Sequence, residues 1–247
     1  RTDRQVVSTF TFPDGLRCRY RVFAERGVPA LSLHILSPQV PTVQSLHLPK
    51  SIERFTELRR GFLLLAGPYG SGRTSTATAI LEAINRTRAE RIVTVEQSIE
   101  YPLAAAKSLV EQQEIGGDTP SYEAALRQSL DDDSTVLMVD DVPNAVALSL
   151  LVELAASRLV LATVTATTAA KALEHLLSVA SSSAVPDIQS ALADVLEGVA
   201  VLRVKPNGLP EAKVSVPTPL VKVPIAGSLP VAGRPARSRA GVVPPPS

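Results

Sequence analysis

The sequence has a single cysteine, Cys18, among its 247 residues, together with a single methionine and no tryptophan. One cysteine excludes an internal disulfide framework and a metal site built on cysteine thiolates, and no leader of charged, apolar and small residues opens the chain. These absences favour a cytoplasmic protein. Because the only methionine is Met138 and the first residue is Arg1, we expect the sequence to be a piece of a longer translated chain.

Long hydrophobic runs are also missing. The longest unbroken apolar stretch, Phe62–Ala66, is far shorter than the roughly 20 residues that a membrane-spanning helix needs. The sequence also has no large excess of positive charge, because its 25 Lys and Arg residues are balanced by 24 Asp and Glu residues. Six of these Lys and Arg residues lie at or beyond Lys205. The sequence therefore predicts no transmembrane segment and no direct binding of nucleic acid, which needs a basic surface.

Proline is concentrated at the C-terminal end, where ten of the 20 prolines lie between Pro206 and Pro246. Mixed with Gly, Ala, Ser and Val, this composition buries too little apolar surface to offset the entropy of ordering the chain. We therefore predict a Pro-rich disordered tail over residues 217–247.

The N-terminal end shows a partial alternation of apolar and polar residues, which is the pattern of a half-exposed strand. Three segments carry it: Gln5–Phe12, Leu16–Glu25 and Ala30–Leu36. The turn signal Pro13-Asp14-Gly15 separates the first two, so we expect a small antiparallel sheet within a partial β-rich module over residues 1–48. Residues 49–60 are expected to form a linker with a short helix at Ser51–Leu58.

From Gly61 onward, short apolar runs alternate with helical patterns. The runs that predict strands are Phe62–Ala66, Ile92–Val95, Val136–Val139, Leu159–Val164 and Val199–Val204. The Ala- and Leu-rich segments that predict helices are Thr74–Ile84, Ser121–Leu130, Ala145–Ala156 and Ala169–Ala180. Thr119 and Pro120 are expected to cap and begin the second of these helices. Such alternation is typical of a parallel sheet covered on both faces, so residues 61–216 are expected to form one α/β domain.

A glycine-rich loop, Gly67–Ser75, joins the first of these strands to the first helix. It fits the phosphate-loop pattern G-x-x-x-x-G-K-[ST], except that Arg73 stands in place of the lysine. Glycines let backbone N–H groups turn toward phosphate oxygens, the helix N-terminus adds partial positive charge, and a threonine hydroxyl can reach a magnesium ion. The nucleotide-binding candidates are Gly67, Gly70, Ser71, Gly72, Arg73, Thr74 and Ser75. The alternative is a turn that only connects the strand to the helix.

With segments further along the chain, this loop resembles the motor ATPases of type IV pilus retraction and type II secretion, over roughly residues 5–216. Thr94–Glu100 is similar to the acidic box of that family, with Gln97 in place of an aspartate. Val136–Asp141 is similar to the family strand that ends in Gly-Glu. Asp141 there replaces the glutamate that polarises the attacking water.

Two more segments carry the resemblance. Thr163–Ala169 is similar to the family's Thr-Leu-His box, with Thr165 in place of the histidine, and Arg19-Tyr20-Arg21-Val22 is similar to its Arg-Phe-Arg-Val strand. Some arginines of that strand reach nucleotide at a subunit boundary, so the resemblance implies phosphate contacts from Arg19 and Arg21. A solvated strand face is the alternative for both arginines.

The resemblance implies a RecA-like P-loop NTPase domain preceded by a small, β-rich (PAS-like) N-terminal module. It implies ATP and Mg²⁺ as cofactors, catalytic candidates at Asp141, Glu96 and Glu100, and metal contacts from Thr74 and Asp141. It also implies a homo- or hetero-oligomer, a hexameric ring in the family, that works in the cytoplasm and peripherally at a pilus or secretion platform of the inner membrane. For Asp140 and Asp141, a solvated strand-end turn is the alternative.

Several positions depart from the family pattern together. Arg73 presents a broad planar cation where a compact ammonium is usual, Asp141 is about one methylene short, and Thr165 offers no imidazole. Because phosphoryl transfer depends on positioning and charge stabilisation, the leading hypothesis is a protein that binds ATP with weak or no hydrolysis. An active hexameric ATPase and a non-catalytic partner subunit are the alternatives. His34, His47 and His175 are expected to be structural or surface residues.

Overall fold

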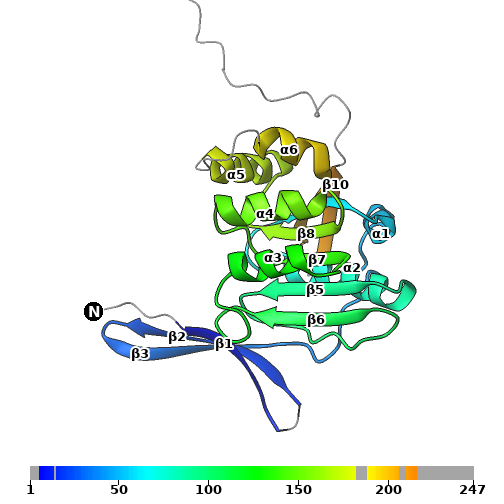
Figure 1. Cartoon of the computed structure of the whole chain (residues 1–247). Coiled ribbons are helices and arrows are strands. Elements are labelled where there is room, and N and C mark those ends of the chain that lie inside the picture. The colour runs from blue at the N-terminus through cyan, green and yellow to red at the C-terminus, as the bar shows by residue number, and fades with distance from the viewer. Residues whose placement is uncertain (1–5, 14, 182–187, 206–209, 216–247) are drawn as a thin grey trace, which may run out of the picture.

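The computed structural model describes residues 6–13, 15–181, 188–205 and 210–215, and its first unit is a three-stranded antiparallel sheet. Strand β2 (Arg17–Glu25) lies between β1 (Val6–Thr11) and β3 (Val28–Ile35). The predicted N-terminal sheet is therefore confirmed, while its PAS-like character and the domain boundaries stay predictions. This sheet lies beside β6 (Leu109–Glu114), the edge strand of the larger sheet (Figure 1).

The larger sheet has seven strands in the order β10-β9-β4-β8-β7-β5-β6. Its remaining members are β4 (Gly61–Ala66), β5 (Arg91–Glu96), β7 (Val136–Val139), β8 (Leu159–Val164), β9 (Leu196–Val204) and β10 (Pro210–Ser215). The five strands that the sequence predicted run parallel, as expected, and the sheet as a whole is mixed because β10 pairs antiparallel with β9. The two strands follow each other through a short connection, and such a connection allows only antiparallel pairing. The predicted tail, residues 217–247, lies outside the described residues.

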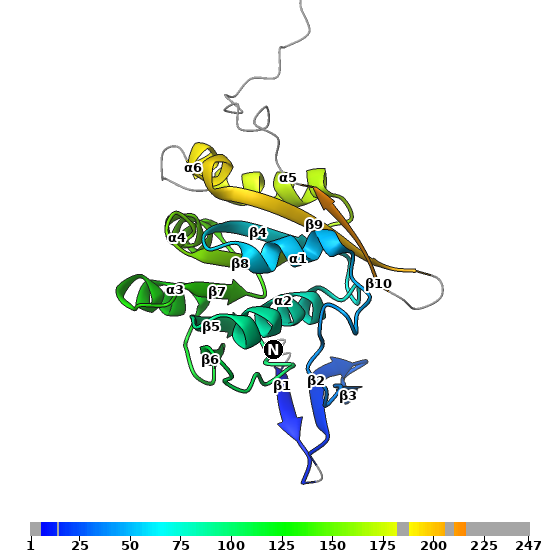
Figure 2. The same ribbon diagram turned by 90° about the vertical axis from the view of Figure 1, so that its right-hand side faces the viewer.

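Helices cover both faces of this sheet (Figure 2). On one face lie α1 (Lys50–Glu57) and α2 (Arg73–Thr87); on the other lie α3 (Tyr122–Asp131), α4 (Ala145–Ala155), α5 (Ala169–Ser181) and α6 (Ile188–Val195). Strand β4 is buried at all six positions, with Phe62 packing on the α4 side and Leu63 on the α2 side. None of the helices in the described residues has the length and apolar character that a bilayer crossing needs.

The start of α3 corrects one prediction. Ser121, not Thr119, is its N-cap, and the Ser121 hydroxyl accepts a hydrogen bond from the backbone N–H of Ala124 at 3.2 Å. Pro120 consequently precedes the cap and does not occupy the first helical position. A serine N-cap satisfies one of the free N–H groups of the first turn in the same way as the predicted threonine.

Strands β4, β5, β7 and β8 run parallel, so their carboxyl ends share one edge of the sheet. The phosphate loop follows β4, the acidic box overlaps the end of β5 and continues beyond it, Asp140 and Asp141 follow β7, and Thr165 follows β8. Loops at the carboxyl edge of such a sheet form the usual ligand crevice. The candidate residues therefore converge there because of strand direction.

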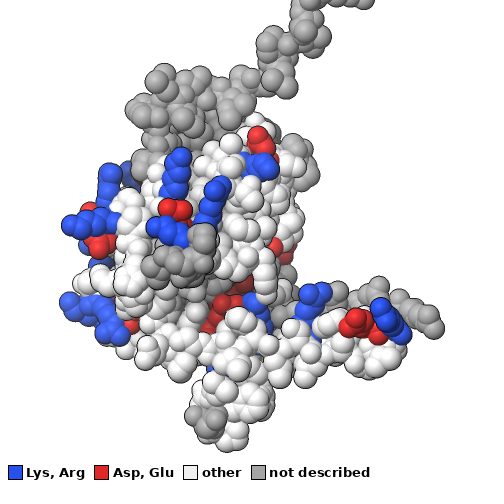
Figure 3. All heavy atoms as spheres, turned by 180° about the vertical axis from the view of Figure 1, so that it is seen from behind, with Lys and Arg blue, Asp and Glu red and all other residues white. Residues whose placement is uncertain are grey.

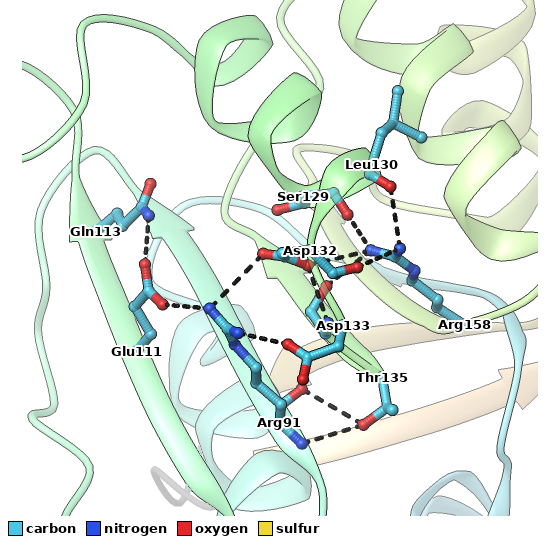
Figure 4. A network of polar contacts seen from close by, with 10 residues as sticks. Arg91, Glu111, Gln113, Ser129, Leu130, Asp132, Asp133, Thr135 and Arg158 are labelled. Atoms are coloured by element: carbon cyan, nitrogen blue, oxygen red, sulfur yellow. Dashed lines mark hydrogen bonds and ion pairs between the residues drawn. The ribbon is translucent and has the colours of Figure 1, made fainter.

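A network of polar contacts lies at the amino ends of the parallel strands, opposite the edge that carries the candidate residues (Figure 4). Arg158, just before β8, donates to Ser134 Oγ at 2.8 Å and to the Asp132 carbonyl at 2.9 Å. It also donates to the carbonyl oxygen of Ser129, near the end of α3. These carbonyls have no partner within the helix, so Arg158 fastens the end of α3 to the start of β8.

We predict that Arg158→Ala lowers the free energy of unfolding by about 2 kcal/mol, because half-buried carbonyl groups would lose their donors. Urea denaturation at pH 7 measures the difference. Lys171→Ala, at an exposed position of α5, is the matched control and should change stability by less than about 0.5 kcal/mol. Equal stability of the two variants would show that the Arg158 contacts contribute nothing.

Candidate functional site

The phosphate loop turns sharply between the end of β4 at Ala66 and the start of α2 at Arg73. Gly70 and Gly72 have φ angles of +74° and +87°, in the left-handed region that favours glycine. A Cβ atom at either position would meet nothing within 4 Å, so backbone conformation and not crowding requires these glycines. Helix α2 has no side-chain cap, which leaves the N–H groups of its first turn available to an anionic ligand.

Gly67 is required for a different reason, namely close packing. A Cβ atom there would lie 2.1 Å from Ser71 Oγ and 2.9 Å from the carbonyl oxygen of Leu202. Ser71 is 3% exposed, and its hydroxyl finds no hydrogen-bond partner among the described residues. A buried, unpaired hydroxyl is unusual in a folded protein, and here it lies inside the loop that the sequence assigns to phosphate.

The loop faces the N-terminal sheet across a cleft of about 430 Å³. The cleft is lined by Arg19, His34, Ile35, Leu36, Ser37, Tyr69, Gly70, Ser71, Gly72, Arg73, Thr74, Ser75, Glu100 and Tyr101. The structure thus brings together most of the predicted nucleotide-binding residues with Arg19 and Glu100. Gly67, Arg21, Glu96 and Asp141 do not line it. Its volume lies in the range of small-molecule sites.

Sequence reasoning assigned no site role to six of the cleft residues, and three of these carry polar groups of interest: Tyr69, Tyr101 and His34. The Tyr69 hydroxyl accepts a hydrogen bond from Arg19 Nη2 at 2.7 Å, and the Tyr101 hydroxyl lies 3.1 Å from Ser75 Oγ. His34, expected to be a structural or surface residue, is exposed and also lines the cleft. The only available signals were the place of Tyr69 within the loop pattern and of Tyr101 directly after the acidic box.

Arg19 links the N-terminal sheet to the acidic box. Its guanidinium forms an ion pair with Glu100 and lies 5.9 Å from the centre of the Tyr69 ring. Figure 3 shows acidic side chains with basic ones where the N-terminal sheet meets the larger domain. Arg21, two residues further along β2, lies over the Phe23 ring and lines a neighbouring hollow instead.

Arg73 is half-buried, and its Nη1 donates a hydrogen bond to Thr165 Oγ1 at 2.9 Å. Burial lowers the pKa of Arg73, and attraction to Asp141, Asp140 and Glu100 offsets part of that effect. The side chain remains a cation, because the pKa of arginine lies far above neutral pH. The two positions that depart most clearly from the family pattern therefore contact each other.

Asp140 and Asp141 lie in the turn after β7 and have opposite environments. Asp140 accepts hydrogen bonds from the Tyr122 hydroxyl and, at 2.8 Å, from the Gln97 backbone N–H. Burial raises the pKa of Asp140 to about 6. Asp141 is exposed and accepts from the backbone N–H of Val142 at 2.8 Å. A solvated strand-end turn, the alternative given for the pair, therefore describes Asp141 but not Asp140.

Glu96 ends β5 and is 2% exposed. Its Oε1 accepts hydrogen bonds from Thr94 Oγ1 at 2.7 Å and from Gln112 Nε2 at 3.2 Å. Burial raises the pKa of Glu96 to about 7, and the nearby charges of Asp140 and Glu100 act in the same direction. Of the three catalytic candidates, only Glu100 lines the cleft. The described residues contain no cluster of three or more His, Cys, Asp or Glu side chains that would hold a metal by themselves.

Comparison with known proteins agrees with this architecture. The family model described as "Type II/IV secretion system protein" matches residues 33–208, more than half of the chain. The chain belongs to this family, whose members related to it include secretion and pilus motor ATPases. The type IV pilus retraction ATPase PilT of Pseudomonas aeruginosa is 28% identical over 77% of this chain and 56% of its own length.

Two further relatives extend the comparison. The type IV pilus ATPase PilU of Pseudomonas aeruginosa is 26% identical over 86% of this chain and 56% of its own length. The crystal structure of the pilus retraction motor PilT with bound ADP superposes with a TM-score of 0.79 at 28% identity, over 89% of this chain and 67% of that one. The ATPase DotB of Legionella pneumophila has a TM-score of 0.74 at 19% identity, over 89% and 64%, which shows the fold alone. The chain spans just over half the length of the two Pseudomonas relatives.

Proposed function

We propose that this chain binds ATP with Mg²⁺ in the cleft between its phosphate loop and the N-terminal sheet, as a subunit of a pilus or secretion motor. One observation carries the proposal. The uncapped start of α2 follows Gly70 and Gly72 in left-handed conformation, and the half-buried Arg73 cation lies in the same cleft. Free N–H groups and a desolvated cation together suit a polyphosphate.

The residues present fit the two cofactors. Gly70, Gly72 and the first turn of α2 would hold phosphate oxygens, and Arg73 would neutralise their charge. Thr74 lines the cleft, and its hydroxyl would contact Mg²⁺. Asp141, the other proposed metal contact, lies outside the cleft lining but near enough to Arg73 to offset part of the pKa lowering that burial causes there. When bound, the ion supplies positive charge against the phosphate oxygens. Arg19 is proposed as a second phosphate contact; Arg21 lines the adjacent hollow.

The proposal also covers the rate of ATP hydrolysis, which we expect to be low. The Asp140 carboxylate already accepts from Tyr122 and Gln97, and the exposed Asp141 accepts from the backbone of Val142. Neither lines the cleft in which an attacking water would be activated. Since a displacement on the order of 1 Å can cost about a hundredfold in rate, we propose that turnover is weak or absent.

A second candidate, an active motor ATPase, is favoured by Glu100. This carboxylate lines the cleft beside Arg19, where it could accept a proton from water. In either case we propose assembly with other copies or with a competent relative, as a hexameric ring in the cytoplasm at a pilus or secretion platform of the inner membrane. A non-catalytic partner subunit is the remaining alternative.

Titration of MgATP by calorimetry tests the proposal. We predict that the wild-type protein and Arg73→Lys both bind, because each keeps a cation beside the loop, and that Arg73→Ala weakens binding by about 10- to 100-fold. That range corresponds to about 1.4–2.7 kcal/mol. Lys171→Ala, on the exposed surface of α5, should bind as the wild type does.

Each other outcome has a definite meaning. Binding by Arg73→Lys alone would show that the natural arginine disables the loop and would favour the partner-subunit alternative. Unchanged affinity of Arg73→Ala would contradict the assignment of Arg73. If the wild type binds MgATP, phosphate release assayed at saturating ATP then separates slow hydrolysis from an active motor, whose rate Glu100→Gln should abolish.

A further inference from the structure

The backbone of Ile99, directly before Glu100, is held at both its carbonyl oxygen and its N–H group. Arg17 on β2 donates from Nε and Nη2 to the Ile99 carbonyl oxygen, at 3.1 and 2.7 Å. The Ile99 backbone N–H donates to Glu114 Oε2 at 3.1 Å. Glu114 ends β6, so the two side chains that hold the Ile99 backbone come from different sheets.

Thr9 on β1 completes the arrangement. Its hydroxyl accepts from Arg17 Nη2 at 2.9 Å and donates to Glu114 Oε2 at 3.4 Å. Arg17, Thr9, Ile99 and Glu114 are all half-buried. Charge-assisted hydrogen bonds in such surroundings are stronger than those on an open surface. The N-terminal sheet and the larger domain are therefore joined at the backbone of one residue, Ile99.

The contact between Ile99 and Arg17 matters because the next residue, Glu100, lines the cleft. Arg17 and Arg19 are two residues apart in β2 and therefore lie on the same face of the strand. Arg19 forms an ion pair with the side chain of Glu100. One arginine thus holds the backbone while its neighbour holds the adjacent carboxylate. The segment from Gln97 to Glu100 lies beyond the end of β5 and outside any helix or strand, so no backbone ladder fixes it.

We propose that Arg17 and Glu114 are positioning residues that set the place of the Glu100 carboxylate in the cleft. Neither residue lines the cleft itself, so both act through the backbone of Ile99. The inference rests on the proposed nucleotide site for its functional consequence. It does not require hydrolysis, because Glu100 and Arg19 line the cleft whether or not turnover occurs.

Two measurements on the full chain test it. Amide hydrogen exchange over residues 97–101 reports the grip on Ile99 without any nucleotide, and we expect Arg17→Ala and Glu114→Ala to speed exchange there by at least about tenfold. Arg17→Lys, which keeps the charge but loses the two-pronged donor, should give an intermediate rate. Arg26→Ala, in the exposed turn between β2 and β3, should leave the rate unchanged.

A double-variant series then separates positioning from general destabilisation. We expect Arg17→Ala to change MgATP affinity about three- to tenfold in the wild-type background and not at all in the Glu100→Gln background, because the effect passes through Glu100. An equal change in both backgrounds would overturn the proposal, as would unchanged exchange in Arg17→Ala. If the wild type does not bind MgATP, the proposed function fails, and the exchange rates alone decide whether Arg17 and Glu114 hold this segment.

Discussion

Glu96→Gln is expected to stabilise the folded protein at pH 8 by on the order of 3 kcal/mol, because it removes a charge that the fold must otherwise bury. Glu96 is 2% exposed, and burial raises its pKa to about 7 from an ordinary value of 4.5. Glutamine can still accept from Thr94 and Gln112 through its carbonyl oxygen. The substitution therefore removes the ionisation and keeps the hydrogen bonds.

The gain should depend on pH in a defined way. As pH rises above 4.5, the unfolded chain ionises at Glu96 before the folded chain does, so the wild-type protein loses stability through this window. Above a pH of about 7 the glutamate is ionised in both states, and the full cost is present. The glutamine variant does not titrate, so its advantage should be near zero at pH 4.5 and should level off above pH 7.

Urea denaturation of both proteins in magnesium-free buffer across this pH range measures the difference. Glu153→Gln, at an exposed position of α4, is the matched control and should change the free energy of unfolding by less than about 0.5 kcal/mol. A Glu96→Gln variant that is less stable than the wild type at pH 8 would mean that the ionised carboxylate is stabilised where it lies. The carboxylate would then be available as a base at neutral pH.

Gly67→Ala is expected to destabilise the protein by about 3 kcal/mol and to weaken MgATP binding at least tenfold. The new methyl group would lie 2.1 Å from Ser71 Oγ and 2.9 Å from both Ser71 Cβ and the Leu202 carbonyl oxygen. The hydroxyl can rotate away, but the carbonyl belongs to β9, which is held by pairing with β10 on one side and β4 on the other. Relief therefore requires the loop to move as a whole, and the conformation proposed to bind phosphate would change with it.

Gly117→Ala offers a clean comparison, because a Cβ atom there would meet its nearest neighbours at 3.9 Å. That variant should retain both stability and affinity to within about 0.5 kcal/mol. Thermal unfolding and calorimetric titration of the two proteins side by side measure both effects. If Gly67→Ala behaved like Gly117→Ala, the loop would have room that its packing against Leu202 does not indicate.

The sequence predicted the strands of the larger sheet well where burial is complete. Strand β4 is buried at every position, and its unbroken apolar run is typical of a parallel strand covered on both faces. Strand β6, with the sequence LVEQQE, was not predicted. It lies at the sheet edge and is half exposed, so its sequence lacks the apolar run that marked the buried strands. The direction of β10 depended on its hairpin with β9, which the alternation of strands and helices does not encode.

The candidate site also has one part that the sequence predicted and one part that it did not. The loop residues from Gly70 to Ser75 were predictable, because their glycine spacing reflects local backbone conformation. The environments of the acidic residues were not, since Glu96 and Asp140 differ from Asp141 only through neighbours such as Gln112 and Tyr122. Those neighbours lie on other strands and helices, and a single sequence contains no signal for such contacts.

By itself, then, the sequence determined the glycine-rich loop, the N-terminal sheet and the order of the buried strands β4, β5, β7, β8 and β9, because dihedral preference and burial periodicity are local properties of the chain. Only the tertiary structure decided which side chains share the cleft. Arg19 meets Glu100 across 81 residues of sequence, and Arg73 meets Thr165 across 92. Such pairings arise from parallel strands that end at one edge and from the placement of a second sheet against it, which are properties of the folded chain as a whole.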